Sequence, residues 1–315
     1  MLRSLAAVVV VIGLVATAHA DSDSDRASRM FDRGRELADR ERFFNHRRVR
    51  DAIARLEIPM DRLTGRPLLL MLDVDGTLAP IAPTPSMARV PDETRRVIES
   101  LVACPGVFVV LVSGRAAHEA RQMVGVDRLW AVGNHGAEVI APNGEVTVDP
   151  SVARYANAMT ATARVLEPAI RAIEGATLEN KTWSLTVHYR AASDDVLPGI
   201  RTAVEQAAAA SGLRVTEGKK ILEVRPPVEI HKGTAVAHMA HSLGGDSPSA
   251  SLLFAGDDVT DEDAFRLLRL DFPRAVTIHI GDGAGFETAA EFRITDLRVL
   301  RDLLSNIEAN ARRQR

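Results

Sequence analysis

An apolar run that ends in two aspartates constrains the fold of this chain more than any other stretch. The segment Leu68–Leu78 reads LLLMLDVDGTL, so Asp73 and Asp75 follow an unbroken apolar run. Such a run is typical of a buried strand in a parallel sheet, whose carboxyl end is where ligands bind. Because side chains alternate along a strand, both carboxylates point to the same side. Two like charges this close together are costly unless a cation or a proton lies between them. The segment therefore predicts a charged ligand site; an Asp-Gly turn that caps a strand is the alternative.

Composition sets broad limits on the class of protein. The chain has 315 residues, of which 46% are hydrophobic, and a formal net charge of −3. At about 150 residues per domain, this length predicts two domains with sizeable cores. A net charge this close to zero gives no reason to expect nucleic acid as a partner. The single cysteine, Cys104, excludes an internal disulfide and a cysteine-based metal site, and we expect it to be a small buried hydrophobe.

Residues 1–20 have the composition of a secretory signal peptide. Arg3 gives a positive start, Leu5–Thr17 is apolar, and Ala18-His19-Ala20 fits a cleavage site before a polar segment. We therefore expect export, to the periplasm, with cleavage after Ala20. Because a spanning helix needs about 20 apolar residues, an uncleaved membrane anchor is the alternative and would be the only contact with a membrane.

Residues 21–66 form a charged, arginine-rich lead-in. Acids and bases are interspersed, and apolar residues recur at helical spacing, at Met30, Leu37, Phe44, Val49, Ile53 and Leu56. This pattern predicts a helix or a pair of helices with one solvated face, packed on the main domain. A basic arm that binds anionic lipid is the alternative, and the interleaved acids argue against it.

From Leu68 onward, apolar strands alternate with helical segments. A helix is expected near Asp92–Ala103 and another from about Ala116, with the strand GVFVVLVSGR between them; SLLFAGDD, AVTIHIG and FRIT continue the alternation near the C-terminus. Strands that alternate with helices predict right-handed crossovers and a doubly wound parallel sheet. We therefore expect an α/β core domain from residues 67–135 and 228–315.

The middle of the chain has a different pattern. AEVIAPNGEVTV predicts a hairpin that closes on Asn143-Gly144, and long helices are expected over Val152–Ile173 and Asp195–Ala210. LENKTWSLTVHYR and LRVTEGKKILEVRP are expected to form paired strands. An insertion of about 90 residues has the size of a domain. Residues 136–227 are therefore expected to form an α+β cap domain with an antiparallel sheet.

At four places in the chain, polar residues follow a predicted strand or stand at the start of a predicted helix. A parallel sheet brings such positions to one crevice. They are Asp73, Asp75, Ser113, Arg115, Lys232, Asp257, Asp258 and Asp261. Carboxylate oxygens without histidine or cysteine suit a hard cation such as Mg²⁺. A hydroxyl, an ammonium group and helix N-terminal amides suit a phosphate. An aspartate beside that site could attack phosphorus, and a second could protonate the leaving oxygen and then activate water.

The order of these motifs resembles a known family. DVDGT, VSGR, the lysine of HKG, and GDDVTDED are similar to the four motifs of the haloacid dehalogenase-like phosphatases. More narrowly, LDVDGTLAPI, VSGR, GNHGAE, HYR, EVRP, HKG and GDDVTDEDAF together resemble the trehalose-6-phosphate phosphatases. The resemblance covers Leu68 to about Ile307, and it implies an α/β cap inserted between the second and third motifs.

The resemblance implies a role for each motif carboxylate. Asp73 would be the nucleophile and Asp75 the general acid and base. Asp73, the backbone carbonyl of Asp75, and Asp257 would hold Mg²⁺. Asp258 and Asp261 would orient the waters of the ion or Lys232.

The same resemblance assigns the phosphate contacts. Ser113 and Lys232 would bind the phosphoryl group and neutralise its charge in a loose transition state. Arg115 would contact the phosphate or the start of a helix, and an ordinary surface salt bridge is the alternative.

The cap residues would select the sugar. The candidates for substrate binding are His135, Glu138, Lys181, His188, Glu223 and Arg225, with Glu138 and Glu223 favoured. Charged groups that bridge vicinal hydroxyls discriminate strongly, because a wrong sugar leaves buried polar groups unpaired. Alternatively, Lys181 and Glu223 form a cross-strand ion pair, and His188 is a hydrogen-bonded core histidine.

The sequence thus predicts a Mg²⁺-dependent phosphatase that acts on a small sugar phosphate. The narrow resemblance implies hydrolysis of trehalose 6-phosphate to trehalose and phosphate through an aspartyl-phosphate. The signal segment leaves open an exported phosphatase of different or broader specificity, for example toward glucosyl- or mannosyl-glycerate phosphate. A catalytically silent carbohydrate-binding protein is a third alternative, against which the retained nucleophile and acid argue.

Overall fold

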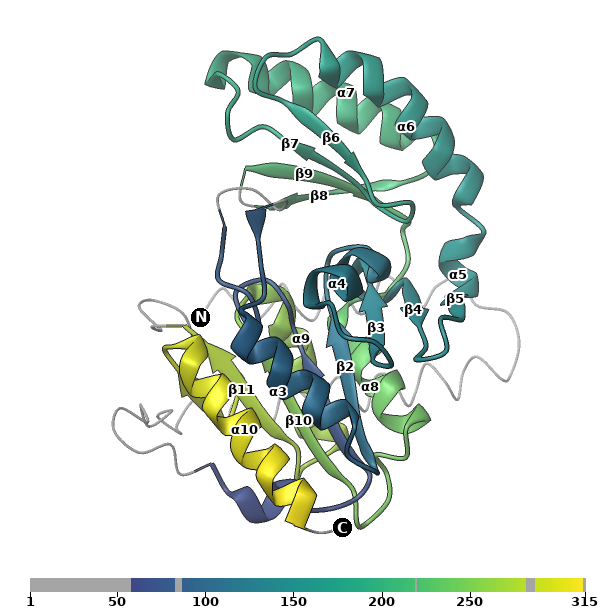
Figure 1. Ribbon diagram of the computed structural model, residues 1–315. Coiled ribbons are helices and arrows are strands. Elements are labelled where there is room, and N and C mark those ends of the chain that lie inside the picture. The colour runs from purple at the N-terminus through teal and green to yellow at the C-terminus, as the bar shows by residue number, and fades with distance from the viewer. Residues whose placement is uncertain (1–57, 83–86, 219, 282–286, 314–315) are drawn as a thin grey trace, which may run out of the picture. The chain divides into compact units, whose positions relative to one another are not determined.

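The computed structural model describes residues 58–82, 87–218, 220–281 and 287–313 (Figure 1). The predicted signal peptide and nearly all of the predicted helical lead-in lie outside these residues. The described end of the lead-in forms a short 3₁₀ helix, η1 (Met60–Leu63). Among the helices that the structure describes, none combines the length and the apolar character needed to span a bilayer.

An eight-stranded sheet forms the core, in the order β12-β11-β10-β1-β2-β3-β4-β5. The first strand, β1, pairs in parallel with β10 on one side and with β2 on the other. Parallel pairing continues outward to β12 and to β3. The strands are β1 (Leu68–Leu72), β2 (Val107–Val112), β3 (Trp130–Gly133), β4 (Glu138–Ile140), β5 (Val146–Val148), β10 (Ser251–Gly256), β11 (Val276–Ile280) and β12 (Phe292–Ile294).

Helices cover both faces of this sheet, which confirms the doubly wound prediction. Leu68, Leu70 and Leu72 pack with α3, α4 and α10, whereas Leu69 and Met71 pack with α8 and α9. All five β1 residues are fully buried, as expected for a strand covered on both faces. Cys104 is buried too. The helices are α3 (Asp92–Val102), α4 (Ala117–Val124), α8 (Lys232–Ser242), α9 (Glu262–Asp271) and α10 (Leu297–Arg313).

The hairpin of β4 and β5 differs from the predicted domain boundary at residue 136. It closes at Asn143-Gly144 as expected, with Gly144 at φ +88°. However, β4 pairs antiparallel with β3, so the hairpin extends the core sheet and is not part of the cap. A turn at Asn134 and His135, both at positive φ, returns the chain along β3. Turn residues predict a hairpin but not the sheet edge that it joins, which explains the difference.

The cap has a separate four-stranded antiparallel sheet, in the order β6-β7-β9-β8. Its strands are β6 (Thr177–Asn180), β7 (Leu185–His188), β8 (Arg214–Gly218) and β9 (Ile221–Arg225). Its helices are α6 (Ala156–Arg171) and α7 (Leu197–Ala210), with the short α5 (Pro150–Ala153) and η4 (Asp194–Val196) before them. The long helix expected over residues 152–173 is thus divided between α5 and α6.

One face of the cap sheet is apolar and the other is polar. Leu185, Val187, Leu222 and Val224 pack with both long helices in a core of their own. Because side chains alternate along a strand, the residues between them point to the opposite face. A row of directly paired polar residues crosses all four strands there: Glu179, Thr186, Glu223 and Thr216.

A glycine lets the helix that carries Lys232 approach its neighbour. A Cβ on Gly233 would lie 2.5 Å from the carbonyl oxygen of Asp263 and 2.9 Å from a methyl group of Leu267. These atoms belong to α9, so α8 and α9 come together at the first turn of α8. By contrast, a Cβ on Gly199, near the start of α7, would contact nothing within 4 Å.

We therefore expect the same substitution to have opposite effects at these two glycines. Gly233→Ala should lower the free energy of unfolding, because overpacking costs about 1–3 kcal/mol and exceeds the helix-propensity gain of up to about 1 kcal/mol. Gly199→Ala should raise it by up to about 1 kcal/mol. Urea denaturation followed by circular dichroism measures both, and stabilisation by Gly233→Ala would contradict the close packing.

Candidate active site

Asp73, Lys232 and Asp261 form a buried ionic cluster. Asp73 directly follows β1, Lys232 begins α8, and Asp261 lies in η5 (Val259–Asp261) before α9. The Lys232 Nζ donates to Asp73 Oδ1 at 2.7 Å and to Asp261 Oδ1 at 2.8 Å. The lysine and Asp73 are each 4% exposed, and Asp261 is fully buried. In a medium that solvates charge poorly, these groups hold one another in place.

Asp257 adds a third carboxylate beside this cluster. It follows β10, and Thr77 Oγ1 donates to its Oδ1 at 3.4 Å. Gly76, at φ +83°, makes room for it, since a Cβ there would lie 2.0 Å from Asp257 Oδ2. Burial, and then the charge of Asp261, raise the pKa of Asp257 to about 7. Gly76 is therefore needed both for its backbone conformation and for the approach of Asp257.

Three carboxylates share one ammonium group in this cluster. Burial opposes the charge of Lys232, but Asp73 and Asp261 outweigh it and raise its pKa. Burial likewise raises the pKa of Asp73 well above its usual range, with Lys232 opposing and the other two aspartates adding to the shift. The cluster therefore has an excess of negative charge, which a proton or a cation would neutralise.

The donor set fits a hard divalent cation. Asp73, Asp257 and Asp261 each offer a carboxylate oxygen, and these oxygens lie within 4.8 Å of one another. Oxygen ligands without nitrogen or sulfur are the set that Mg²⁺ prefers. Both oxygens of Asp261 already accept hydrogen bonds, from Lys232 and from the amides of Asp257 and Asp258. Asp73 and Asp257 are thus the two carboxylates better placed to hold an ion.

Asp258 lies at the edge of this cluster. Its side chain is exposed and accepts a hydrogen bond from Val259 N at 2.7 Å, which caps the short helix η5. It contacts the cluster through Asp261 in a capping box: its backbone amide donates to Asp261 Oδ2 at 3.0 Å, and its side chain accepts from the backbone amide of Asp261.

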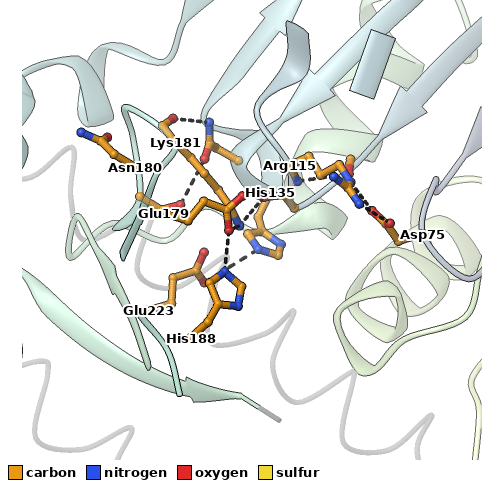
Figure 2. Close-up of polar contacts among 12 residues, drawn as sticks. Asp75, Arg115, His135, Glu179, Asn180, Lys181, His188 and Glu223 are labelled. Atoms are coloured by element: carbon orange, nitrogen blue, oxygen red, sulfur yellow. Dashed lines mark hydrogen bonds and ion pairs between the residues drawn. The ribbon is translucent and has the colours of Figure 1, made fainter. Parts of the chain in front are cut away.

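Asp75 is paired with Arg115 in a two-pronged salt bridge. Arg115 Nε and Nη2 donate to the two carboxylate oxygens of Asp75, each at 2.6 Å (Figure 2). The hydrogen bond to Asp75 raises the pKa of Arg115. Of the two roles expected for Arg115, the structure shows an ion pair, although a more specific one than an ordinary surface bridge. This geometry fixes the direction of the Asp75 carboxylate.

Ser113 lies at the end of β2, beside the first residues of α4. It is 2% exposed, and its hydroxyl accepts a hydrogen bond from the amide of Arg115 at 3.1 Å. Its backbone carbonyl accepts from His135 N at 3.1 Å. A Cβ on Gly114 would lie 2.7 Å from His135 Cε1, so the imidazole rests directly on this loop.

His135 also contacts the polar face of the cap sheet. Its Nε2 lies 3.8 Å from Glu223 Oε2, and Arg225 Nη1 lies at the same distance from that oxygen. Burial lowers the pKa of His135 well below its usual range, and nearby cations including Lys232 lower it further. The imidazole is therefore neutral near pH 7. Burial also lowers the pKa of Arg225.

Glu179 contacts the remaining two predicted cap residues, His188 and Lys181. Its Oε2 lies 2.8 Å from His188 Nε2 and 3.6 Å from Lys181 Nζ (Figure 2). Burial would raise the pKa of Glu179, but the hydrogen bond from His188 and the charge of Lys181 outweigh it and lower the pKa. Lys181 also donates to the carbonyl of Gly114 at 3.4 Å. The alternative of an ion pair between Lys181 and Glu223 is not what the structure shows, since Lys181 pairs with Glu179.

Glu138 has a different environment from the other predicted sugar-binding residues. It lies on β4 of the core sheet, not on the cap, and is 8% exposed. Its Oε1 accepts from Ala117 N at 2.8 Å and from Asn134 Nδ2 at 2.9 Å. These contacts hold the start of α4 against the turn after β3.

Sequence reasoning missed Glu179 and Asn134. Glu179 lies two positions before Lys181, so alternation continued past the end of β6 would place both side chains on one side and could have identified it. Asn134 lies in the GNHGAE motif, from which only His135 and Glu138 were predicted as site residues. Its importance depends on contacts between distant segments, for which the sequence offers no local signal.

The fold and these groups of residues define the haloacid dehalogenase-like class of proteins with an inserted cap. The family model described as trehalose-phosphatase matches residues 71–285. The chain belongs to the trehalose-phosphatase family.

Curated relatives include proteins described as trehalose-phosphate phosphatases. A trehalose-phosphate phosphatase of Mycolicibacterium paratuberculosis is 33% identical over 251 residues, which are 78% of this chain and 63% of that protein. A Mycobacterium tuberculosis protein described as an uncharacterized glycosyl hydrolase is 36% identical over 236 residues, which are 74% of this chain but 18% of that protein. The chain thus spans less than two thirds of the length of these curated relatives.

Solved structures show the same fold. The crystal structure of a trehalose-6-phosphate phosphatase related protein is 27% identical, with a TM-score of 0.67; the match covers 78% of this chain and all of that one. The C-terminal domain of trehalose-6-phosphate phosphatase from C. albicans is 22% identical, with a TM-score of 0.63, over 79% of this chain and 96% of that one. The second likeness shows the fold alone.

The raised pKa of Asp257 predicts how stability depends on pH without a metal ion. A carboxyl that titrates near pH 7 in the folded chain and near 4 in the unfolded chain keeps its proton longer when folded. Its contribution to the free energy of unfolding is therefore present at low pH and lost as pH rises from about 4 to about 7. With EDTA present, wild-type protein should lose more stability than Asp257→Asn between pH 5.5 and 7.5. Parallel changes in urea denaturation would contradict this.

Proposed function

We propose that the chain is a Mg²⁺-dependent phosphatase that hydrolyses trehalose 6-phosphate to trehalose and phosphate. The observation that carries the proposal is the buried cluster in which Asp73, at the end of the central strand, contacts Lys232 beside two further carboxylates. Membership of the trehalose-phosphatase family, together with relatives named for that activity, supports the substrate.

In the proposed reaction, Asp73 attacks the phosphorus atom and the bond from phosphorus to the sugar oxygen breaks. Asp75 donates its proton to that oxygen, so the sugar leaves as an alcohol. Asp75 then accepts a proton from water, the water oxygen attacks the aspartyl-phosphate, and the acyl-phosphate bond breaks to release phosphate and restore Asp73. At the end of the cycle, both aspartates have returned to their starting states.

The surrounding groups stabilise charge at the phosphorus atom. Lys232 is held against Asp73, and Ser113 Oγ lies in the adjacent loop with the amides at the start of α4. When bound, Mg²⁺ held by Asp73, Asp257 and the backbone carbonyl of Asp75 would neutralise charge on the phosphoryl oxygens. Positioning and electrostatics then account for most of the rate enhancement in phosphoryl transfer.

The polar face of the cap supplies contacts for the sugar. Glu223 lies in the row of polar residues on that face, and Lys181, which holds Glu179, contacts Gly114 in the loop of residues 113–115 (the phosphate loop). Carboxylate and ammonium groups suit neighbouring hydroxyls, and a sugar with the wrong arrangement would leave them unpaired. In this proposal, the core performs the chemistry and the cap selects the substrate.

Replacing the nucleophile should abolish turnover. Asp73→Asn keeps the size of the side chain but removes the charge needed for attack, so we expect phosphate release from trehalose 6-phosphate with Mg²⁺ to fall by at least about 1,000-fold. Asp127→Asn, the same change at an exposed position, is the control and should leave the rate unchanged. Phosphate release by Asp73→Asn at the wild-type rate would reject the mechanism.

A cap substitution should separate sugar recognition from chemistry. Glu223→Gln should raise the KM for trehalose 6-phosphate about tenfold or more, because a charged acceptor for sugar hydroxyls is lost. It should change the KM for p-nitrophenyl phosphate less than about threefold, because that substrate has no sugar. Glu217→Gln, on β8 of the same sheet but exposed, is the matched control. Equal effects of Glu223→Gln on both substrates would exclude it from sugar recognition.

We further propose that the chain is exported, on the strength of residues 1–20. Cell fractionation with N-terminal sequencing tests this, since a mature protein starting at Asp21 in the exported fraction is expected. A cytoplasmic, full-length protein would overturn it. A panel with trehalose 6-phosphate, sucrose 6-phosphate, glucose 6-phosphate and mannosyl-glycerate phosphate then tests the substrate, and equal turnover of all four would favour an exported phosphatase of broader specificity.

A further inference from the structure

One side chain that the proposed chemistry does not use links the core to the cap. The Asn134 Nδ2 donates to Glu138 Oε1 at 2.9 Å and to the backbone carbonyl of Lys181 at 3.1 Å. Its Oδ1 accepts from Ser184 Oγ at 3.1 Å. The first partner belongs to the core sheet, whereas the other two lie in the turn between β6 and β7 of the cap.

Burial makes these hydrogen bonds specific. Asn134 is 3% exposed and Ser184 is 2% exposed. Polar groups buried to this degree are costly when they lack partners, and here both atoms of the amide group are used. Asn134 also has φ +50°, a conformation that asparagine adopts more readily than most residues. The position therefore favours asparagine for its backbone as well as for its amide group.

The link connects the two parts of the proposed substrate site. On the core side, Glu138 Oε1 also accepts from Ala117 N, at the start of the helix that follows Ser113 and Gly114. On the cap side, Lys181 holds Glu179 and donates to the carbonyl of Gly114. The loop assigned to the phosphate and the turn that carries Lys181 are thus joined through the Asn134 amide group as well as by the contact of Lys181 with Gly114.

We infer that Asn134 is a positioning residue that fixes the Lys181 turn of the cap relative to the phosphate loop. By this means it determines how well the enzyme binds the sugar part of a sugar phosphate. The inference rests on the proposed function for its effect on KM, but the link itself has a readout that does not depend on activity.

The geometry shows why aspartate at position 134 should not maintain the link. Nδ2 lies between two oxygen acceptors, the carboxylate of Glu138 and the carbonyl of Lys181. Asn134→Asp would place a third oxygen there, with a negative charge near that of Glu138, and would remove both donated hydrogen bonds. Aspartate still tolerates positive φ, so the change acts on the link and not on the turn.

The test compares Asn134→Asp with Asn143→Asp, the same change in the exposed hairpin turn. We expect Asn134→Asp to raise the KM for trehalose 6-phosphate about tenfold or more and to change that for p-nitrophenyl phosphate less than about threefold. We also expect faster hydrogen exchange in the peptide that contains residues 181–184. The control variant should match wild type in all three measurements.

A second variant guards against a folding defect. Asn134→Gly keeps the backbone conformation, removes the whole amide group and should change KM and exchange in the same direction. If it melts like wild type but shows wild-type KM and exchange, the inference is overturned. If wild type has no phosphatase activity, the proposed function fails, and hydrogen exchange alone then decides: faster exchange in the variants supports the link, and unchanged exchange overturns it.

Discussion

The placement of Lys232 between Asp73 and Asp261 is the interaction on which the rest of the site depends. A lysine buried this deeply is tolerated only with charged partners, and its two short contacts provide them. The same contacts join the end of β1 and the short helix η5 to the start of α8, so the charge cluster and the arrangement of these elements depend on each other. Removing the lysine would leave buried carboxylates without a counter-charge, which is a larger penalty than the loss of one hydrogen bond.

Close packing of backbone around this cluster is equally important. Gly76, Gly233 and Gly256 lie at positions where a Cβ would meet the side chain of Asp257, the backbone of α9 and the side chain of Asp261 respectively. The motifs are therefore not only a set of reactive groups. Their glycines allow strands and helices to bring the carboxylates within 4.8 Å of one another.

The core could be predicted from sequence more fully than the cap. Asp73, Lys232 and Asp257 each lie at a strand end or a helix start, and a parallel sheet necessarily brings such positions together. The sequence predicts the hairpin that contains Glu138 but not the strand beside which that hairpin lies. Its pairing with β3 places Glu138 in the core sheet and not in the cap. The partner of Arg115 could not be predicted either, because its ion pair with Asp75 depends on how two loops face each other. Local patterns specify elements, whereas contacts such as these depend on register between distant segments.

The cap has a hydrophobic core separate from the two that flank the main sheet. Substitutions on the polar face of its sheet therefore need not disturb packing around Asp73. Such a division allows the two parts of the chain to vary independently. The hairpin of β4 and β5, by belonging to the main sheet, places the boundary between them after residue 148.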